Sequence, residues 1–256
     1  MTSIPLGPRE AHVWYRWSDR LDSRAIEDAS RSLSGDECAR AVRFRFADDR
    51  RDYIVAHDLL RRALSRYAPI EPPDWRFEAG THGKPFVAAP DLPSRLSFSL
   101  SHTRGVVACA IAHGEHVGVD TERLTRVLTA ADLGDGILSS EEAAALQRCD
   151  PDDRATHLID LWTLKEAFVK ATGLGLSQPV DTLCFHFSAD GGIEFVPPQT
   201  GSACWHVALF ALSEHARLSV AFTTTEAGAP QISVRDDDGG SDAKGLEPVR
   251  ASRRNL

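Results

Sequence analysis

The sequence lacks several features that would place the protein outside the cytoplasm. No apolar run in its 256 residues approaches the roughly 20 residues that span a bilayer. The N-terminus, MTSIPLGPRE, lacks the basic-then-apolar order of a secretory signal. Hydrophobic residues (42%) and charged residues (26%) occur at values ordinary for a globular chain. We therefore expect a cytoplasmic protein with no membrane partner, long enough for one large domain or two small domains sharing a core.

Cysteine is sparse and shows no paired spacing. The sequence contains no C-x-x-C pair, and its cysteines are Cys38, Cys109, Cys149, Cys184 and Cys204. This odd, scattered set argues against a zinc ribbon and against a disulfide framework. We expect reduced, mostly buried thiols, because free cysteine usually packs as a small hydrophobic residue.

An excess of positive charge is also missing. The formal net charge is −8, which argues against general nucleic-acid binding. Basic residues nevertheless gather between positions 40 and 51, at Arg40, Arg43, Arg45, Arg50 and Arg51. Such a run is usually a solvated helix face, although it can also serve a phosphate-rich small ligand.

Hydrophobic periodicity predicts two successive units of helices followed by strands. The first has a strand at 12–17, a polar helical stretch at 23–46 and an amphipathic helix at 50–67. Short strands follow it, and the segment 106–112 is apolar on both faces, as in a central buried strand. The second unit has helices near 139–148 and 151–172 and strands near 181–188, 192–196, 204–212 and 216–224. The order predicts an α+β fold with a two-fold plan.

The order of elements also predicts how the chain divides. Residues 1–113 form an N-terminal half and residues 114–225 a C-terminal half. The segment 226–256 has almost no apolar periodicity, which indicates a disordered tail. We interpret its DDD run as part of a solvated linker.

Two carboxylates in HVGVDTE (116–122) share one face of a predicted strand. Alternation places Gly118, Asp120 and Glu122 on one side and the intervening residues on the other. Two carboxylates about 7 Å apart along a strand repel each other unless solvent or a cation lies between them. Oxygen ligands suit Mg²⁺; a wet acidic strand end is the alternative.

The segment 160–175 predicts a helix with an unusual stripe. Trp162, Glu166 and Lys170 fall at i, i+4 and i+8, and Lys165 lies about 100° around the axis from Glu166. These charges lie among many apolar residues, which favours a partly buried site over a solvated Glu–Lys pair. Asp150 and Pro151 are the expected N-cap and first helical residue, and Gly173 is the expected C-cap.

Two shorter elements complete the candidate site. Ser101 and His102 end a predicted strand, where adjacent side chains point to opposite faces, so they do not form a hydrolase dyad. His102 can serve a phosphate, act as a base or be structural. Lys84 lies in a turn between Gly83 and Pro85. The sequence has neither a G-x-S-x-G elbow nor a complete phosphate-binding loop.

Taken in order, these elements resemble the larger, surfactin-type class of 4'-phosphopantetheinyl transferases. The signature of that family is a G-K-P turn, an S-H pair, a G-[VI]-D-x-E strand and a W-x-x-K-E-x-x-x-K-x-x-G helix. The matching residues are Gly83-Lys84-Pro85, Ser101-His102, Gly118-Val119-Asp120-Thr121-Glu122, and Trp162, Lys165, Glu166, Lys170 and Gly173. The resemblance spans residues 10–225.

The resemblance implies a pseudo-two-fold α+β monomer in which each half is a small, mostly antiparallel sheet packed on a long helix. Coenzyme A would bind between the halves as co-substrate. The resemblance also assigns roles to residues. Mg²⁺ would be held by Asp120, Glu122 and Glu166. The phosphates would be contacted by Lys84, Ser101, His102, Lys165 and Lys170, and the adenosine 3'-phosphate by Arg51 or Arg43.

The implied reaction transfers the 4'-phosphopantetheine arm of coenzyme A to a serine of an acyl or peptidyl carrier protein, and it releases adenosine 3',5'-bisphosphate. Glu166, or Glu142 through a water, would be the base, with Lys170 and His102 also in the catalytic group. The match at Glu142 is looser, with Glu141 as a rival, because Ile137-Leu138 stand where the family often has an aromatic pair.

Three other functions stay open at this point. One is a non-catalytic coenzyme A-binding module, and another is a Mg²⁺-dependent enzyme that hydrolyses a nucleotide diphosphate. The third is a helix-and-sheet scaffold whose acidic pairs have no function. The carrier protein that a transferase would serve is not readable from the sequence.

Overall fold

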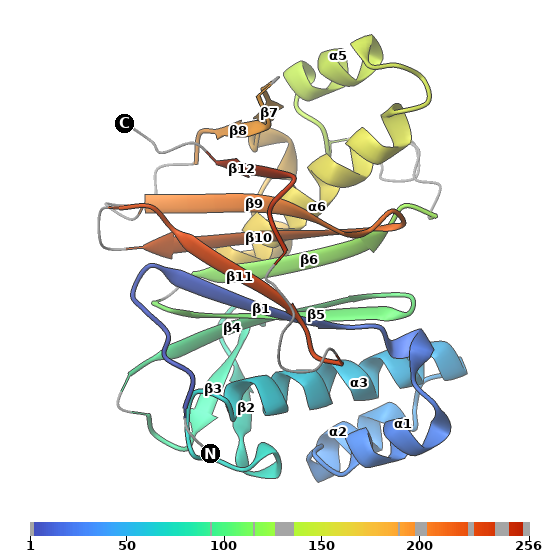
Figure 1. Ribbon diagram of the computed structural model, residues 1–256, viewed down its shortest axis with the longest axis vertical. Coiled ribbons are helices and arrows are strands. Elements are labelled where there is room, and N and C mark those ends of the chain that lie inside the picture. Colours follow the sequence, from blue (N-terminus) through green and yellow to red (C-terminus); the bar gives the residue numbers. More distant parts are fainter. Residues whose placement is uncertain are drawn as a thin grey trace.

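The computed structural model describes residues 3–92, 94–114, 116–125, 136–188, 190–197, 204–224, 228–238 and 246–252 (Figure 1). Two sheets lie face to face in the middle of the molecule, and one long helix covers the outer face of each sheet. Among the described helices, none has both the length and the apolar character that crossing a bilayer requires.

The first sheet comes mainly from the N-terminal part of the chain. Its strands are β1 (Glu10–Arg16), β4 (Leu96–Thr103), β5 (Val106–His113) and β11 (Gln231–Asp236). The order is β11-β1-β5-β4, and β5 is antiparallel to both of its neighbours. The prediction of a central buried strand at 106–112 is therefore confirmed. The long helix α3 (Ala47–Leu64) packs on Val107, Cys109 and Ile111 of β5.

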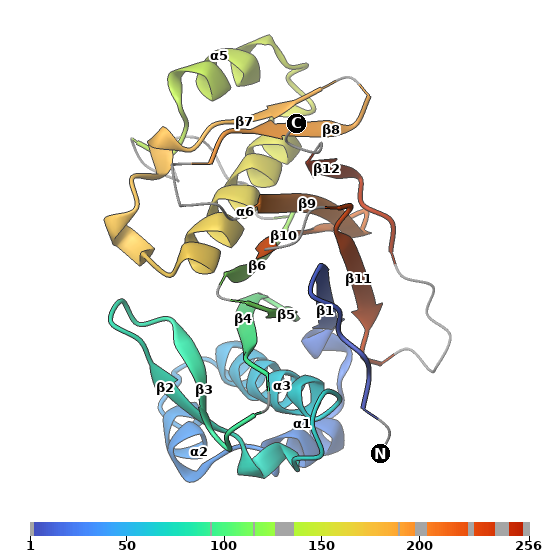
Figure 2. The ribbon, with the colours of Figure 1, turned by 90° about the vertical axis from the view of Figure 1, so that its left-hand side faces the viewer.

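Smaller elements surround this sheet. The polar helical stretch predicted at 23–46 is two helices, α1 (Ser23–Ser30) and α2 (Gly35–Ala41). The break occurs at Ser34, whose hydroxyl accepts from the Glu37 N–H while the Glu37 carboxylate accepts from the Ser34 N–H. Strands β2 (Arg76–Ala79) and β3 (Pro85–Ala89) form a separate hairpin that reaches towards the end of the second long helix (Figure 2).

The second sheet belongs to the C-terminal part of the chain. Its strands are β6 (Val117–Arg123), β7 (Phe185–Phe187), β8 (Gly192–Phe195), β9 (Cys204–Ser213), β10 (Ala216–Thr224) and β12 (Arg250–Ser252). The order is β6-β10-β9-β12-β8-β7. Helix α6 (Arg154–Thr172) covers its outer face, and α5 (Ser140–Arg148) packs beside α6. Short 3-10 helices lie at Ser18–Arg20, Pro72–Asp74, Gly175–Ser177 and Val180–Thr182.

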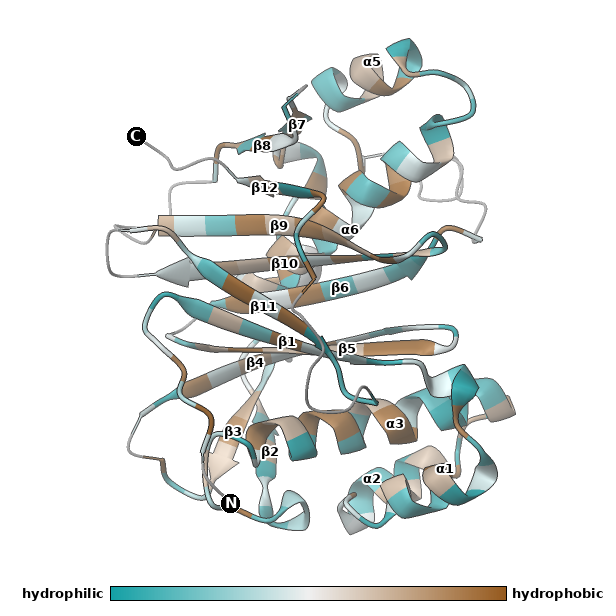
Figure 3. Cartoon of the chain, viewed as in Figure 1, coloured by the Kyte–Doolittle hydropathy of each residue, from teal (hydrophilic) through white to brown (hydrophobic). Residues whose placement is uncertain are grey.

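The main core lies between the two sheets. Val13 and Val106 contribute from the first sheet, and Val119, Phe210 and Val220 contribute from the second. Each of these side chains is completely buried. Figure 3 shows apolar residues along the strands of both sheets. Because the halves share this core, removal of their inner faces from water stabilises both halves together.

The predicted C-terminal end of α6 is correct, and the predicted N-terminal end is wrong. The helix begins at Arg154, with Asp153 before it, so the prediction of Asp150 as N-cap and Pro151 as first helical residue is wrong. Asp150 Oδ1 instead accepts from the Asp152 N–H at 3.1 Å and closes a turn ahead of the helix. Gly173 ends the helix in the left-handed conformation with φ 72°, as predicted.

The prediction of a disordered tail is wrong for the part of 226–256 that the structure describes. Strand β11 pairs with β1 in parallel, and β12 lies between β9 and β8. Val234 is buried and Ile232 packs against the main core, so a six-residue strand with two apolar side chains completes the sheet edge. The DDD run is not a solvated linker, because Asp237 and Asp238 accept from Arg66 and Arg16, both at 2.6 Å.

The expectation of mostly buried cysteines is also wrong. Cys109 is buried, whereas Cys149 and Cys184 are partly exposed and Cys38 and Cys204 are exposed. None of the five forms a disulfide, in agreement with the sequence prediction.

A glycine allows α6 to approach the second sheet closely. A Cβ at position 118 would lie 1.9 Å from the carbonyl oxygen of Ala167 and 2.5 Å from the amide nitrogen of Ala171. Both atoms belong to the backbone of α6 and cannot rotate away. Gly118 is therefore required for the contact that brings α6 against β6.

We expect Gly118→Ala to lower the free energy of unfolding by about 3 kcal/mol, the upper end of the usual cost of overpacking. Denaturant unfolding followed by circular dichroism measures this change. Gly35→Ala is the matched control, because a Cβ there meets nothing within 4 Å. Equal stability of Gly118→Ala and the wild type would contradict the close approach.

Candidate functional site

The candidate site lies where the two sheets adjoin, between β4 and β6. These strands belong to different sheets. Side-chain hydroxyls connect them: Ser99 Oγ accepts from the Val119 N–H at 3.1 Å, and Ser101 Oγ accepts from the Thr121 N–H at 3.3 Å. Ser99 and Ser101, two residues apart on β4, thus both face β6 with their hydroxyl groups.

The acidic residues of β6 face the same polar row. Ser101 Oγ donates to Asp120 Oδ1 at 2.8 Å, and Thr103 Oγ1 donates to Glu122 Oε2 at 3.1 Å. Both carboxylates are more than nine-tenths buried. Asp120 Oδ2 is buried too, and it accepts no hydrogen bond from any described residue. A buried carboxylate oxygen without a donor is costly, so this atom is available to an external partner.

Helix α6 supplies the remaining charged groups. The stripe Trp162, Glu166 and Lys170 is only partly buried, while the residues between its members are buried. Lys170 Nζ donates to Asp120 Oδ1 at 2.6 Å and to Ser101 Oγ at 2.9 Å. The stripe is therefore partly buried, as its position among apolar residues predicted.

The carboxylates of Glu166, Asp120 and Glu122 share one electrostatic environment. Burial raises the pKa of Glu166, the charge of Asp120 raises it further, Lys170 opposes the shift, and Glu122 adds to it. The acidic residues of β6 and of α6 therefore lie close enough for the charge of one to affect another. Their combined negative charge exceeds the single positive charge of Lys170.

These residues fit a hard divalent cation bound together with a phosphate ligand. The donor set is entirely oxygen, and Asp120 Oδ2 has no donor among the described residues. The three carboxylates do not form a closed cage, because they are not among the described triplets of ligand atoms that lie within 4.8 Å of one another. An open set suits Mg²⁺, which usually takes one or two carboxylates together with substrate phosphates and water.

A cavity of about 430 Å³ adjoins these groups. The turn between β2 and β3, strand β4 and the last turns of α6 form its walls. Its lining includes Lys84, Ser99, Glu166, Lys170 and Gln178. Apolar side chains together with a few charged and polar ones are the typical lining of a small-molecule site.

Lys84 connects the hairpin to the C-terminal half. Its Nζ donates to the carbonyl oxygens of Val117 at 3.0 Å and Ala171 at 2.7 Å. Burial, helped by the charge of Arg95, lowers the pKa of Lys84 to about 8. Gly83, with φ 84°, makes the turn that aims this side chain at the end of α6. Lys84 therefore lines the cavity while two carbonyls hold its ammonium group.

Two predicted site residues have a different role in the structure. Lys165 and Glu142 have fully buried side chains that form an ion pair at 2.6 Å. Lys165 also donates to the carbonyl oxygens of Ile137, Val180 and Leu183. The predictions of Lys165 as a phosphate contact and of Glu142 as a catalytic residue are therefore corrected. These donors and acceptors are satisfied inside the protein, on the side of α6 away from Glu166.

The remaining predicted site residues, His102, Arg51 and Arg43, differ in how exposed they are to solvent. His102 is exposed at the end of β4. Partial burial of its side chain lowers its pKa; the charge of Asp52 opposes this shift, and the charge of Lys170 adds to it. Arg51 pairs with Asp48 and Asp52. Arg43 is exposed and forms no ion pair with a described residue.

Sequence reasoning missed the contacts of Ser99 and Thr103 and the inward direction of the Ser101 hydroxyl. The available signal was the alternation of Ser97, Ser99, Ser101 and Thr103 along one strand. A strand with a hydroxyl at every second residue has a polar face, and that face here meets the acidic strand.

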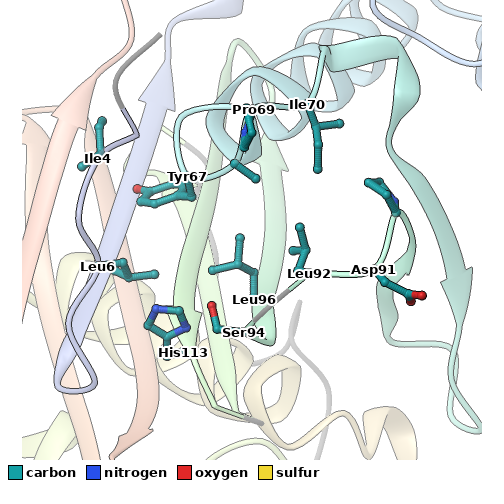
Figure 4. A pocket seen from close by; sticks show the side chains of 12 residues that line it. Ile4, Leu6, Tyr67, Pro69, Ile70, Asp91, Leu92, Ser94, Leu96 and His113 are labelled. Carbon is teal, nitrogen blue, oxygen red and sulfur yellow. The ribbon is translucent and has the colours of Figure 1, made fainter.

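A second cavity, of about 500 Å³, lies in the N-terminal half (Figure 4). Its walls include Ile4, Leu6, Tyr67, Leu92 and Leu96. None of the predicted site residues lines it. This cavity is therefore separate from the carboxylates at the junction.

Known proteins with similar sequences belong to one family. A family described as the 4'-phosphopantetheinyl transferase superfamily matches residues 116–237, and one described as 4'-phosphopantetheinyl transferase, N-terminal, matches residues 16–114. The chain is 31% identical over 169 residues to the 4'-phosphopantetheinyl transferase HetI of Nostoc, covering 66% of this chain and 71% of that protein. It is 28% identical over 173 residues to the 4'-phosphopantetheinyl transferase Sfp of Bacillus subtilis, covering 68% and 75%.

Among solved structures, a holo-(acyl-carrier-protein) synthase from Bacillus anthracis in complex with CoA (3',5'-ADP) superposes with a TM-score of 0.38 and 16% identity. The match covers 44% of this chain and 97% of that chain. The family assignment comes from the sequence matches, which span both halves. On those matches, the chain belongs to the 4'-phosphopantetheinyl transferase superfamily.

Proposed function

We propose that the protein transfers the 4'-phosphopantetheine arm of coenzyme A to a serine hydroxyl of an acyl or peptidyl carrier protein, and releases adenosine 3',5'-bisphosphate. One observation carries the proposal: Asp120 and Glu122 lie close to Glu166 and Lys170, and the latter two residues line a cavity. Membership of the family and the names of the relatives support the same reaction.

Asp120, Glu122 and Glu166 would hold Mg²⁺. When bound there, Mg²⁺ would neutralise and orient the diphosphate of coenzyme A. The unpartnered Asp120 Oδ2 supports this assignment, as does the all-oxygen donor set. Ser101 and Thr103 fix the two strand carboxylates by donating to one oxygen of each, so the carboxylates need little reorganisation.

Lys170 would stabilise negative charge on the departing adenosine 3',5'-bisphosphate. Its ammonium group lies at the cavity and is held by Asp120 and Ser101. A cation held in place before the reaction stabilises developing charge more than a mobile one does. Lys84, which lines the cavity, and the exposed His102 would contact phosphates, and Arg51 or Arg43 would reach the adenosine 3'-phosphate.

Glu166 is the proposed base that takes the proton from the carrier serine. Glu166 lines the cavity, where its carboxylate can meet the hydroxyl of a bound acceptor. Glu142, the rival base, is fully buried against Lys165 and would have to break that pair to reach a water. The geometry therefore favours Glu166.

We also propose that the two halves are repeats related by a pseudo-two-fold axis and that the protein is a monomer. The central strands support the repeat, because β1-β5-β4 in one sheet and β6-β10-β9 in the other follow the same order of elements along the chain. Each set lies under one long helix, α3 or α6. The repeat would divide the chain at about residue 113, between β5 and β6.

The direct test is incubation with fluorescent coenzyme A and a panel of apo carrier proteins, with and without Mg²⁺. The proposal predicts labelled carrier only when Mg²⁺ is present. Release of free phosphopantetheine without any carrier would instead indicate a hydrolase. If the protein neither labels a carrier nor binds coenzyme A, the proposed function is wrong.

We expect Asp120→Asn to lower kcat/KM by about 10²- to 10³-fold, the usual effect of losing one electrostatic contact in an active site. The amide oxygen still accepts from Ser101 and Lys170, so the loss reflects charge. Asp58→Asn is the matched control. Asp58 is also a buried aspartate that accepts hydrogen bonds, from Ser32 and Arg62, but it lies on α3 and does not line the cavity. Steady-state labelling and thermal melts of both variants separate activity from folding. Normal Mg²⁺-dependent labelling by Asp120→Asn would refute the metal assignment.

Lys170→Ala should lower kcat by about 10²-fold and weaken coenzyme A binding much less, because the proposed contact strengthens as charge develops on the leaving group. Rates at saturating coenzyme A, together with calorimetric binding, measure the two effects. Arg148→Ala removes an exposed positive charge from α5 and should change neither. An unchanged maximal rate in Lys170→Ala would exclude the leaving-group role.

A further inference from the structure

A second group of ligand atoms lies outside the candidate active site, where α5 meets β7. Glu141, in the first turn of α5, faces Cys184 and His186 at the beginning of β7. Among the described residues, this is the triplet whose possible ligand atoms all lie within 4.8 Å of one another. Cys184 is partly buried and the other two side chains are exposed.

The three ligand atoms converge on one point. Cys184 Sγ lies 3.2 Å from His186 Nε2 and 3.6 Å from Glu141 Oε2, and the latter two atoms are 2.9 Å apart. Bond lengths of about 2.3 Å for Zn–S and about 2.0–2.2 Å for Zn–N and Zn–O give ligand separations of about 3.4–3.6 Å in a tetrahedron. The separation of Cys184 Sγ and Glu141 Oε2 already fits a tetrahedral site. The other two separations, from His186 Nε2 to the sulfur and to the carboxylate oxygen, would each have to increase by a few tenths of an ångström.

The same geometry argues against a catalytic triad. His186 uses one ring nitrogen, Nε2, towards both Cys184 and Glu141. A proton relay needs the two different nitrogens of the ring, one facing the nucleophile and the other the carboxylate. Convergence on one nitrogen is instead the arrangement of ligands around a cation.

The ligand chemistry differs from that of the active site. Thiolate and imidazole favour borderline-soft cations such as Zn²⁺, whereas an oxygen-only set favours Mg²⁺. Ser139 Oγ donates to Cys184 Sγ at 3.2 Å and orients the sulfur. The carboxylate of Glu141, 3.6 Å from the sulfur, supplies an anionic ligand beside the thiol.

We propose that Glu141, Cys184 and His186 form a binding site for a zinc-type divalent cation, with a fourth position open to water or to a partner's ligand. Binding releases the thiol proton to solvent as the sulfur–metal bond forms. The cation would tie the first turn of α5 to β7. It would also stabilise the fold according to its occupancy.

The test is a titration of the metal-free, untagged chain with Co²⁺, whose bond to a thiolate gives an intense near-ultraviolet charge-transfer absorption. We expect this absorption to saturate at a single ion per chain and to disappear when Zn²⁺ is added. Cys184→Ser should abolish it, and His186→Ala should weaken binding at least about tenfold, since one of three ligands is lost. Cys204→Ser and His215→Ala are matched controls, because Cys204 is another exposed thiol and His215 forms an exposed pair with Glu214 at 3.2 Å without a thiol nearby.

The cobalt titration tests the proposed cation site independently of transferase activity. Asp120→Asn, which alters the proposed Mg²⁺ site, should keep the cobalt absorption, and excess Mg²⁺ should not displace it. Circular dichroism of each variant identifies any loss of fold, and Glu141→Gln, at an exposed position, provides a third ligand variant. Absence of the charge-transfer absorption in the folded wild type would overturn the proposal, as would an undiminished absorption in folded Cys184→Ser.

Discussion

The contact among Lys170, Asp120 and Ser101 determines the rest of the site. It joins three elements, the helix α6 and the strands β6 and β4, and the two strands belong to different sheets. A lysine and an aspartate held this way are paired and hydrogen-bonded, which makes their burial tolerable. The contact leaves one oxygen of Asp120 without a donor among the described residues. The same contact thus links β4, β6 and α6 and leaves a carboxylate oxygen that the proposed cation could bind.

That contact depends on how closely α6 approaches β6. Gly118 permits the approach, since any Cβ there would collide with the backbone of Ala167. Gly118, Asp120 and Glu122 share one strand face, so the residue that admits the helix and the residues that meet its charges come from one alternating pattern. The strand therefore encodes both the packing and the placement of the carboxylates. The other face of β6, with Val117 and Val119, belongs to the core between the sheets.

Much of this was predictable from sequence, because it rests on local periodicity. The two-residue period of β6 predicted that Asp120 and Glu122 share a strand face, and the four-residue stripe of α6 predicted that Glu166 and Lys170 share a helix face. Only the family resemblance implied that these two faces meet. Lys165 was misassigned because its partners, Glu142 and three carbonyls, are distant in sequence, and only the fold shows that they fill its hydrogen-bonding capacity. Strand β11 was missed for a similar reason, since its two apolar residues become a strand only when the edge of β1 is there to pair with.

The first turn of α5 shows how adjacent residues acquire opposite roles. Glu142 points inward, where it accepts from Lys165 and from the N–H groups of Ser139 and Phe185, while Glu141 points outward towards Cys184 and His186. The buried pair fixes α5 by polar contacts whose loss would leave an uncompensated charge. Because that pair also sets the position of residues 141 and 184, it holds the outward cluster in its converging geometry. A cation bound there would add to an anchor that already exists, and its effect would reach α6 through Lys165, the residue next to Glu166.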